Sequence, residues 1–501
     1  MAGKKSSVVK GVVWVGLGRA AYVIISFVST IILARLLTPD DFGIVAIASA
    51  AAAVVAVVAD LPLSKAVIHH DNPEDEHFHT IWTFGLIRAV LMVALIGGSA
   101  PFVADFYGDE RITGLLIALS FSAALGSLQN PVLSLYERDL IFWQTIALSL
   151  ADRIANFIVS IAVAYIYRSP WAIVLGVLAA AITRLILSYV FRTYRPKLSL
   201  SKARELMSFS IWLTLGSWVQ ALNAKADPLV VGFFTNTSQL GIYSMSQRLA
   251  SMTVGQIQSP IATVLFPTLA RMRNDPIRLR AAYLRVQAVF CTVAFPVGVG
   301  FALLADPVVR LVLGPQWIPA IPIVQVFILM QAANAVQHVG PISMATGHTR
   351  ALFWRDLQIL LLRAPLLIGG ILLGRASDIG MIRGAVYGLA ISQAIMIVWS
   401  IMLIRTLNGI GLRDHFQGAW RPLLACGIMA CVVLVAEAVL APIPPTVEGY
   451  ATLAAIILLG GLTYCLSMLL VWYIKGRPDG PEQELLNIVN PALHRLRRNL
   501  G

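Results

Sequence analysis

The sequence predicts an all-α polytopic membrane protein with about fourteen transmembrane helices, from its composition, its apolar runs and the charges of its loops. Of the 501 residues, 58% are hydrophobic and only 13% are charged, whereas a soluble domain carries about 25% charged residues. The apolar residues gather in runs of about 20, which cross a hydrocarbon core of about 30 Å as a helix. One large soluble core is therefore excluded.

The first six predicted spans make up the first part of the chain. They are residues 11–33, 42–62, 81–104, 112–134, 143–167 and 171–191. A short polar turn, LLTPDDFG, separates the first two spans, and a basic stretch follows the sixth. Each span is a predominantly apolar run of about 20 residues, as a membrane helix requires.

Eight further apolar runs complete the prediction. They are residues 208–231, 239–268, 283–304, 318–340, 354–374, 381–404, 421–440 and 450–473. Several spans contain proline, which predicts kinks of the kind that packed membrane bundles tolerate. These prolines are Pro62, Pro131, Pro228, Pro260, Pro267, Pro296 and Pro365.

Positive charge alternates along the predicted loops. With the N-terminus in the cytoplasm, 22 of the 38 Lys and Arg residues fall in cytoplasmic segments and 5 in outer loops. Cytoplasmic loops of membrane proteins carry such an excess. The alternation favours an even number of spans with both termini in the cytoplasm.

An internal repeat divides the chain. A shift of 198 residues aligns Trp14 with Trp212, Gly18 with Gly216, Gly43 with Gly241, and Pro62 with Pro260. The shift covers six spans, so the two repeats have the same orientation in the membrane, as parallel transporter repeats do. We therefore expect an N-terminal lobe (1–200), a C-terminal lobe (201–415), two added helices (416–475) and a basic cytoplasmic tail (476–501).

The stretch ARLLTPDDFGIVAI (34–47) resembles the N-terminal signature of Wzx-like polysaccharide flippases. These form the polysaccharide-transporter branch of the multidrug/oligosaccharidyl-lipid/polysaccharide exporter superfamily. DPLVVGFFTNTSQLGIYSMSQRL (227–249) is similar to the family's equivalent turn, but lacks the acid–Pro pattern of the first turn. The fourteen-helix layout is also that of the family, and the likeness covers essentially the whole chain.

The resemblance implies a non-enzymatic transporter in the bacterial inner membrane. Its expected cargo is an undecaprenyl-diphosphate-linked oligosaccharide, moved from the inner to the outer leaflet for exopolysaccharide, capsule or lipopolysaccharide biosynthesis. The expected partners are this lipid-linked substrate, membrane lipids, and a polysaccharide polymerase with export machinery. The net charge of +13 follows the loop pattern, so no nucleic-acid partner is expected.

Basic residues within the predicted spans outnumber acidic ones. A charge at the bilayer centre costs about 2.5–3.5 kcal/mol on insertion scales, so these side chains should face a cavity or a partner helix. Helical spacing places several of them on polar stripes, and in the span 318–340 it aligns Gln331, Asn334 and His338. The predicted cavity residues are Arg19, Arg153, Asn156, Lys225, Arg248, Asn334 and Arg363.

An excess of positive charge in the cavity suits an anionic substrate. Guanidinium groups bind a diphosphate bidentately, and amides and hydroxyls hydrogen-bond to sugars. Asp152 and Asp227 either couple transport to H⁺ or Na⁺, or neutralise Arg153 and Lys225. The sequence contains no GxxxxGK[ST] motif for ATP, so an ion gradient is the expected energy source.

Catalytic residues, metal ligands and bound cofactors are not expected. HHDNPEDEHFH (69–79) contains histidine and carboxylates, but it lies in a predicted cytoplasmic loop where no rigid elements fix a ligand set. We therefore interpret it as a solvated acidic loop. The four cysteines have neither metal-ligand nor CxxC spacing.

Two other functions are considered. An ion-coupled multidrug antiporter of the same superfamily should have an acidic or aromatic cavity, which the embedded bases oppose. A membrane glycan polymerase or ligase should carry acids or a histidine base in a large outer loop, whereas the predicted outer loops are short and have no D-x-D motif. A flippase explains the embedded charges best.

Overall fold

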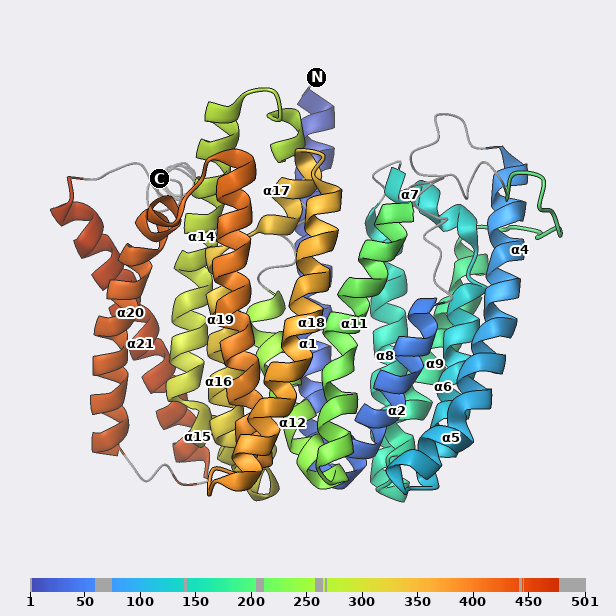
Figure 1. Cartoon of the computed structure of the whole chain (residues 1–501), viewed down its shortest axis with the longest axis horizontal. Helices are drawn as coiled ribbons and strands as arrows, with labels where there is room; N and C mark the ends of the chain where they lie inside the picture. Colours follow the sequence, from blue (N-terminus) through green and yellow to red (C-terminus); the bar gives the residue numbers. More distant parts are fainter. Residues whose placement is uncertain are drawn as a thin grey trace, which may run out of the picture. The chain divides into compact units, whose positions relative to one another are not determined.

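A computed structural model of the chain describes residues 2–58, 74–138, 142–203, 211–256, 265, 268–440, 444 and 446–476. Within these ranges every regular element is a helix (Figure 1). The chain divides into two compact units, residues 1–244 and 245–501. Among the described residues, eleven helices are long and apolar enough to cross a membrane, which confirms an all-α polytopic membrane protein.

Unit 1 is built from nine α-helices and the start of a tenth in its described part. They are α1 (Ala2–Leu36), α2 (Pro39–Val58), α4 (Asp75–Met92), α5 (Gly98–Tyr107), α6 (Arg111–Ser127), α7 (Ser134–Arg138), α8 (Phe142–Tyr167), α9 (Trp171–Phe191), α11 (Ile211–Phe234) and α12 (Thr237–Ala250). A π-helical turn, Val93–Gly97, joins α4 to α5. α12 crosses the boundary between the units.

Small residues set the close packing of α1, α8 and α9. A Cβ on Gly18 of α1 would overlap the side chain of Ile146 on α8. A Cβ on Gly176 of α9 would overlap the hydroxyl of Ser160 on α8. Small residues at helix interfaces let membrane helices approach closely. The three helices thereby bring their polar side chains together.

Unit 2 consists of long helices joined by short turns. They are α14 (Pro276–Leu303), α15 (Ala305–Val308), α16 (Ile321–Ala333), α17 (Val339–Ala345), α18 (Thr349–Ala376), α19 (Met381–Asn408), α20 (Leu412–Leu440) and α21 (Val447–Ile474). α14 begins after Asp275, whose carboxylate accepts a hydrogen bond from the N–H of Arg278. Pro276 occupies the first helical position, where its missing N–H costs nothing.

Two glycine series pack α18 against α19. Gly370 of α18 faces Gly384 of α19. Gly374 of α18 faces Gly380, the residue directly before the first residue of α19. A Cβ on Gly370 would overlap the carbonyl oxygen of Gly384, and a Cβ on Gly384 would overlap that of Gly370. Spacing of four residues on both helices is the pattern that lets membrane helices touch backbone to backbone.

The predicted span 318–340 lies within a candidate membrane span, Pro315–Ala345, but the helix of this segment is broken. α16 ends at Ala333, a 3-10 turn covers Asn334–Val336, and α17 starts at Val339. Pro341 has no N–H to continue a helical hydrogen-bond ladder, and Gly340 precedes it. Gln331, Asn334 and His338 therefore do not share one helical face as their spacing had indicated.

Three of the predicted spans fall outside the group of eleven. They correspond to α6, to α11, and to α12 with the following π-helical turn Ser251–Gly255. α6 is apolar but only 17 residues long. The prolines aligned by the repeat, Pro62 and Pro260, and the tail beyond residue 476 lie outside the described residues. The count of fourteen stays a prediction.

Candidate functional site

Asp152 of α8 forms a salt bridge with Arg184 of α9. The distance from Asp152 Oδ2 to Arg184 Nη1 is 2.9 Å. Arg184 Nε also donates to Gln129 Oε1 at 3.2 Å, so the guanidinium joins three segments of unit 1. The structure thus pairs Asp152 with Arg184, a partner that the sequence analysis had not named. Adjacent residues on a helix do not face each other.

Arg153 instead lies over an aromatic ring. Its guanidinium carbon is 5.3 Å from the ring centroid of Tyr22 on α1, a cation–π contact. Arg153 Nε is buried and has no hydrogen-bond partner. Arg19 precedes Tyr22 by three residues and so shares its helix face. The structure thus brings Arg153 and the Arg19 face of α1 to the same part of unit 1.

The other predicted site residues of unit 1 lie on α8 and α11. Asn156 is half-buried, one helical turn beyond Asp152. On α11, Asp227 is buried whereas Lys225 is exposed. Residues two apart on a helix point about 200° away from each other, so Asp227 and Lys225 occupy different sides of α11.

Asn334 belongs to a cluster of amide side chains in unit 2. Its Oδ1 accepts a hydrogen bond from Gln393 Nε2 of α19, and its Nδ2 donates to Gln331 Oε1 at 3.3 Å. The remaining predicted residues are Arg248 of α12 and Arg363 of α18, both half-buried. The amide cluster presents the donors and acceptors that recognise hydroxyl groups.

The turns of the two repeats touch within unit 1, in a contact that we call the outer junction. A Cβ on Gly43 would overlap the carbonyl oxygen of Thr237, and a Cβ on Gly241 would overlap that of Pro39. Thr237 is the repeat equivalent of Pro39, since 237 − 39 = 198. The sequence offset had aligned these turns but had not placed them in contact.

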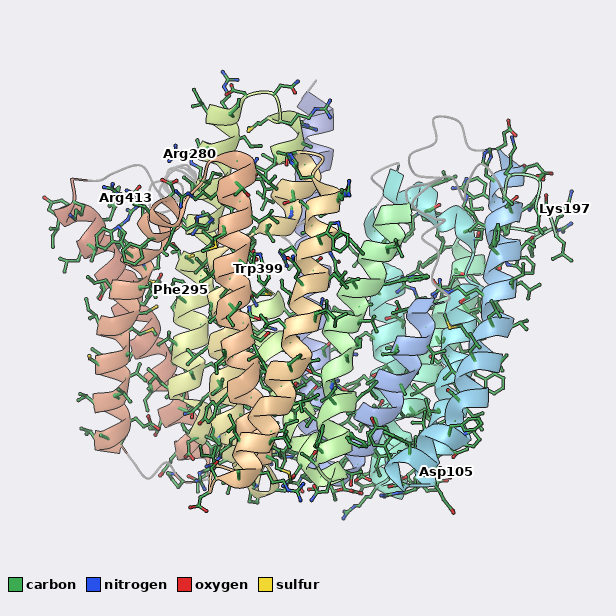
Figure 2. All side chains as sticks on the ribbon, viewed as in Figure 1. Asp105, Lys197, Arg280, Phe295, Trp399 and Arg413 are labelled. Atoms are coloured by element: carbon green, nitrogen blue, oxygen red, sulfur yellow. The ribbon has the colours of Figure 1, made fainter. Side chains whose placement is uncertain are left out.

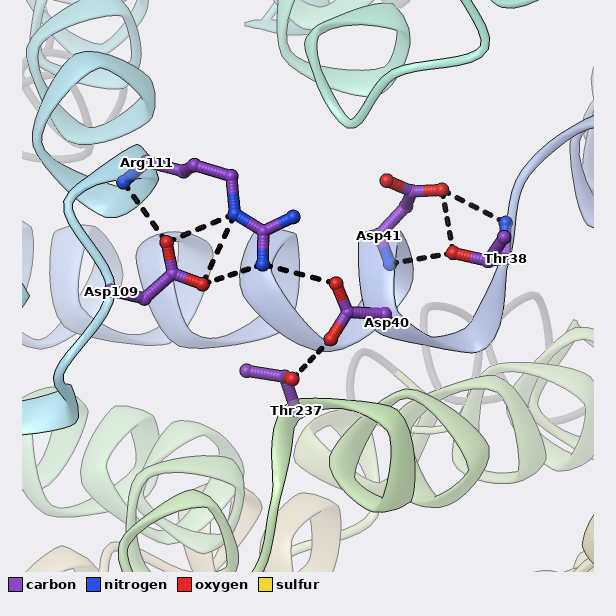
Figure 3. A network of polar contacts seen from close by, with 6 residues as sticks. All are labelled: Thr38, Asp40, Asp41, Asp109, Arg111 and Thr237. Carbon is purple, nitrogen blue, oxygen red and sulfur yellow. Dashed lines mark hydrogen bonds and ion pairs between the residues drawn. The ribbon is translucent and has the colours of Figure 1, made fainter.

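A polar network reinforces the outer junction (Figure 3). The Thr237 hydroxyl donates to Asp40 Oδ1, and Arg111 Nη2 binds Asp40 Oδ2 at 3.1 Å and Asp109 Oδ2 at 2.7 Å. The hydrogen bond from Arg111 holds the pKa of Asp109 below its usual value. Three segments of unit 1, namely α2, α6 and the start of α12, are thereby tied together.

The predicted acidic loop 69–79 is only partly described, and its end is not a solvated loop. α4 begins at Asp75, and His77 and His79 within it are buried. Glu76 accepts hydrogen bonds from the hydroxyls of Ser199 and Ser201, and Tyr194 contacts His79 Nδ1 at 2.7 Å. Acidic residues suit a helix N-terminus, which is the signal that predicts α4 here. The described residues contain no cluster suited to a metal ion.

The α4 start and the outer junction lie at opposite ends of unit 1. Figure 2 shows Lys197, in the segment that contacts α4, at one end and Asp105, near the outer junction, at the other. The sequence assigned the first to the cytoplasm and the second to the outer side. The salt bridge of Asp152 lies on helices that run between the two ends.

Comparison with known families identifies the chain. A model of the polysaccharide biosynthesis protein family matches residues 32–322, more than half of its length. The chain belongs to this polysaccharide biosynthesis family. The match includes the stretch 34–47, on which the resemblance to polysaccharide flippases was based, and that resemblance is confirmed.

Curated relatives of this family member are similar over most of their length. The succinoglycan biosynthesis transport protein ExoT of Rhizobium meliloti is 24% identical, with 85% of this chain and 86% of ExoT covered. The lipopolysaccharide biosynthesis protein WzxC of Escherichia coli is 21% identical, with 84% of each chain covered. The expectation of a membrane transporter and not an enzyme is confirmed by such relatives.

Solved structures share the fold of this family member. The lipid II flippase MurJ, in an inward closed conformation, matches with a TM-score of 0.69 and 14% identity over 94% of this chain and all of MurJ. An inward-facing multidrug transporter of the MATE family matches with a TM-score of 0.55 and 13% identity over 80% of this chain and 99% of that chain. At these identities the likeness concerns the fold alone.

Proposed function

We propose that this family member is a flippase for an undecaprenyl-diphosphate-linked oligosaccharide in the bacterial inner membrane. Its relatives ExoT and WzxC are named for succinoglycan and lipopolysaccharide biosynthesis. The exported glycan then enters exopolysaccharide, capsule or lipopolysaccharide. In this proposal fourteen spans form two six-helix lobes plus two helices, with both termini in the cytoplasm.

The contact of Arg153 with Tyr22 carries the proposal. A guanidinium held over an aromatic ring at 5.3 Å keeps its charge without a carboxylate partner. Its neighbour Asp152 is engaged by Arg184, so the pair adds no net charge. Arg153 therefore supplies positive charge to this region, and Arg19 adds to it from the same part of α1. A diphosphate or an acidic sugar is the ligand that such charge favours.

The amide cluster around Asn334 suits the neutral part of the substrate. Gln331, Asn334 and Gln393 contact one another through their side-chain amides. Amides in this arrangement exchange hydrogen bonds with sugar hydroxyls at little cost, because each partner lost is replaced. We assign the arginines to the diphosphate and the amides to the glycan.

Alternating access requires a closure that opens. The outer junction is suited to this role. Its glycines make close backbone contact, and a hydrogen bond joins Thr237 to Asp40 across it. In the proposed cycle the junction separates when the substrate reaches the outer leaflet. A gradient of H⁺ or Na⁺ drives the cycle, and a polymerase with export machinery consumes the product.

A leaflet-accessibility assay tests the function. The chain is reconstituted in vesicles loaded on one side with lipid-linked oligosaccharide, and a membrane-impermeant glycosidase reports how much reaches the other side. We expect transfer that depends on the protein and on the diphosphate. Absence of transfer, together with uptake of a cationic dye by the same vesicles, would establish a multidrug antiporter instead.

A further inference from the structure

A chain of buried polar groups lies toward one end of unit 2, the end that the loop charges assign to the cytoplasm. It joins α14, α20 and the break between α16 and α17. Tyr283 of α14 and His415 of α20 are 1% and 0% exposed. Arg280 and Arg413, near this chain in sequence, lie toward the same end of unit 2, while Phe295 lies further in (Figure 2). An ionisable side chain so buried in a membrane protein calls for a functional explanation.

The partners of His415 fix the direction of its hydrogen bonds. His415 Nδ1 lies 2.8 Å from the carbonyl oxygen of Gly411, which only accepts, so Nδ1 carries a proton. In the neutral ring Nε2 is then an acceptor, and the Tyr283 hydroxyl, 3.2 Å away, donates to it. The Tyr283 oxygen in turn accepts from the backbone N–H of His338 at 3.1 Å.

This chain holds the helix break in place. The N–H of His338 has no helical partner, because the 3-10 turn ends before it and α17 begins after it. The break also contacts α14 at two further points. The Cys291 thiol donates to the carbonyl oxygen of Ala335 at 3.5 Å, and the Phe290 ring stacks on the His338 ring with centroids 4.1 Å apart.

Few charged groups face His415. From α14, Arg280 binds Asp414 at 2.7 Å, and the second oxygen of Asp414 accepts from the N–H of Gly411. Arg405 of α19 approaches Gly411 with its side chain. The other titratable groups packed against the chain are His338, Tyr283 and Cys291. Among the described residues, the carboxylate beside His415 is that of Asp414, which is thus already engaged by a guanidinium and a backbone N–H.

We propose that His415 is a proton-binding site and that its protonation releases the helix break between α16 and α17 from α14 and α20. A proton from cytoplasmic water adds to Nε2, which then points a donor at the Tyr283 oxygen. The hydroxyl must turn its own proton away, and the imidazolium is buried beside a carboxylate that is already paired. The arrangement that holds the break is therefore stable only with neutral His415.

The proton-binding site itself does not depend on the proposed function. Its role, to couple proton entry to transport, rests on the proposed function. In that role His415 replaces Asp152 as the coupling group, because Asp152 is held by Arg184. The amide cluster is part of the same break through Asn334. A proton on His415 would therefore change the setting of residues that we assign to the glycan.

Cys291 is a native reporter for this release, since it is 0% exposed and contacts the break directly. The other cysteines are removed (C426A, C431A and C465A), and the full chain in lipid nanodiscs is treated with N-ethylmaleimide at about pH 8 and about pH 5.5, across the imidazole range. Each rate is divided by that of glutathione at the same pH. We expect the normalised rate to rise about tenfold or more on acidification.

Matched variants assign the response. H415Q should abolish the rise, whereas H338Q, which keeps the backbone N–H, and H348Q, outside the chain, should retain it. If H415Q does not fold, Y283F serves, because loss of the hydroxyl should give fast labelling at both pH values. A normalised rate that ignores pH, or a rise that survives H415Q, would overturn the proposal. Loss of the rise in H338Q alone would move the site to His338 and overturn the assignment.

The labelling needs no substrate, so it separates this inference from the proposed function. Vesicles that label as expected but flip no lipid-linked oligosaccharide contradict the flippase and leave the proton site standing. Vesicles that flip with the same pH dependence in parent and H415Q contradict the coupling role. We expect H415Q to flip with a rate that no longer varies between about pH 8 and about pH 5.5.

Discussion

Asp152 and Arg184 form a salt bridge across α8 and α9, although the adjacent Arg153 is the nearer base in sequence. Arg153 instead contacts the ring of Tyr22, so the neighbouring residues Asp152 and Arg153 have different partners and different proposed roles. The guanidinium of Arg184 is paired with a carboxylate, and that of Arg153 lies over the aromatic ring of Tyr22. The predictions below test each role separately.

Removal of the Arg153 charge should slow transport and leave the fold intact. We expect R153A to flip lipid-linked oligosaccharide about 10- to 100-fold more slowly, the value of one or two charge-assisted hydrogen bonds to the substrate. R153K should recover part of the rate, since lysine keeps the charge but not the planar group. Vesicle assays at matched protein amounts measure this, and wild-type rates in R153A would contradict the cationic site.

The pair of Asp152 and Arg184 should contribute to stability as a unit. D152N and R184Q each leave a polar partner unmatched, so the thermal unfolding midpoint in detergent should fall in both. In the double variant the loss should be smaller than the sum, with a coupling of about 0.5–3 kcal/mol. R195Q, an exposed arginine outside the helices, is the control. Strict additivity would show that the salt bridge contributes nothing.

We expect the outer junction to open in each transport cycle. With the four native cysteines replaced by alanine, cysteines at positions 40 and 237 (D40C and T237C) should be joined by a short bifunctional thiol reagent. We expect the joined protein to stop flipping. D40C alone, treated with the same reagent, should continue. Full activity after complete joining would mean that the junction stays closed throughout the cycle.

A side chain at Gly370 should disrupt the packing of α18 against α19, whereas a side chain at the neighbouring Gly369 should not. A Cβ on Gly370 overlaps backbone, whereas nothing lies within 4 Å of a Cβ on Gly369. G370L should therefore destabilise unit 2 by about 1–3 kcal/mol or more, the cost of overpacking. G369L should change the unfolding midpoint far less. Equal effects would refute the close packing.

Acid should weaken the outer junction through Asp109. Because Arg111 lowers the pKa of Asp109 from its usual 3.8, this carboxylate stabilises the fold fully above that value. The contribution is lost as the pH falls through the lowered pKa, when the carboxylate becomes protonated. The difference in unfolding midpoint between parent and D109N should therefore shrink below pH 3.8. A difference that grows in acid would contradict this sign.

Much of the fold follows from the sequence, because lipid demands long apolar helices and loop charge sets their direction. Arg153 was singled out because it is a base within a largely apolar helix, and the structure places it half-buried over Tyr22. Its aromatic partner was not predicted, because Tyr22 lies on a distant helix and periodicity describes only one helix at a time. The salt bridge of Asp152 was missed for the same reason, because its partner Arg184 is 32 positions further along the chain.

The buried chain around His415 shows a different limit. His338 was placed on a polar stripe by its spacing from Asn334, which assumes a continuous helix. The Gly-Pro pair at 340–341 was the signal of a break, and it was not used. His415 and Tyr283 carry no local pattern at all. Only the approach of α20 to α14 turns them into a site.

The symmetry of the outer junction has an evolutionary consequence. Each glycine packs on the residue that is the repeat equivalent of the other glycine's contact, so the two turns present the same face to each other. Such a face is isologous, as in two-fold homodimers. A single ancestral half would already contain both sides of this contact. The hydrogen bond between Thr237 and Asp40 has no counterpart on the other side, because their repeat equivalents are Pro39 and Ser238, so the contact has a direction that identical halves would not have.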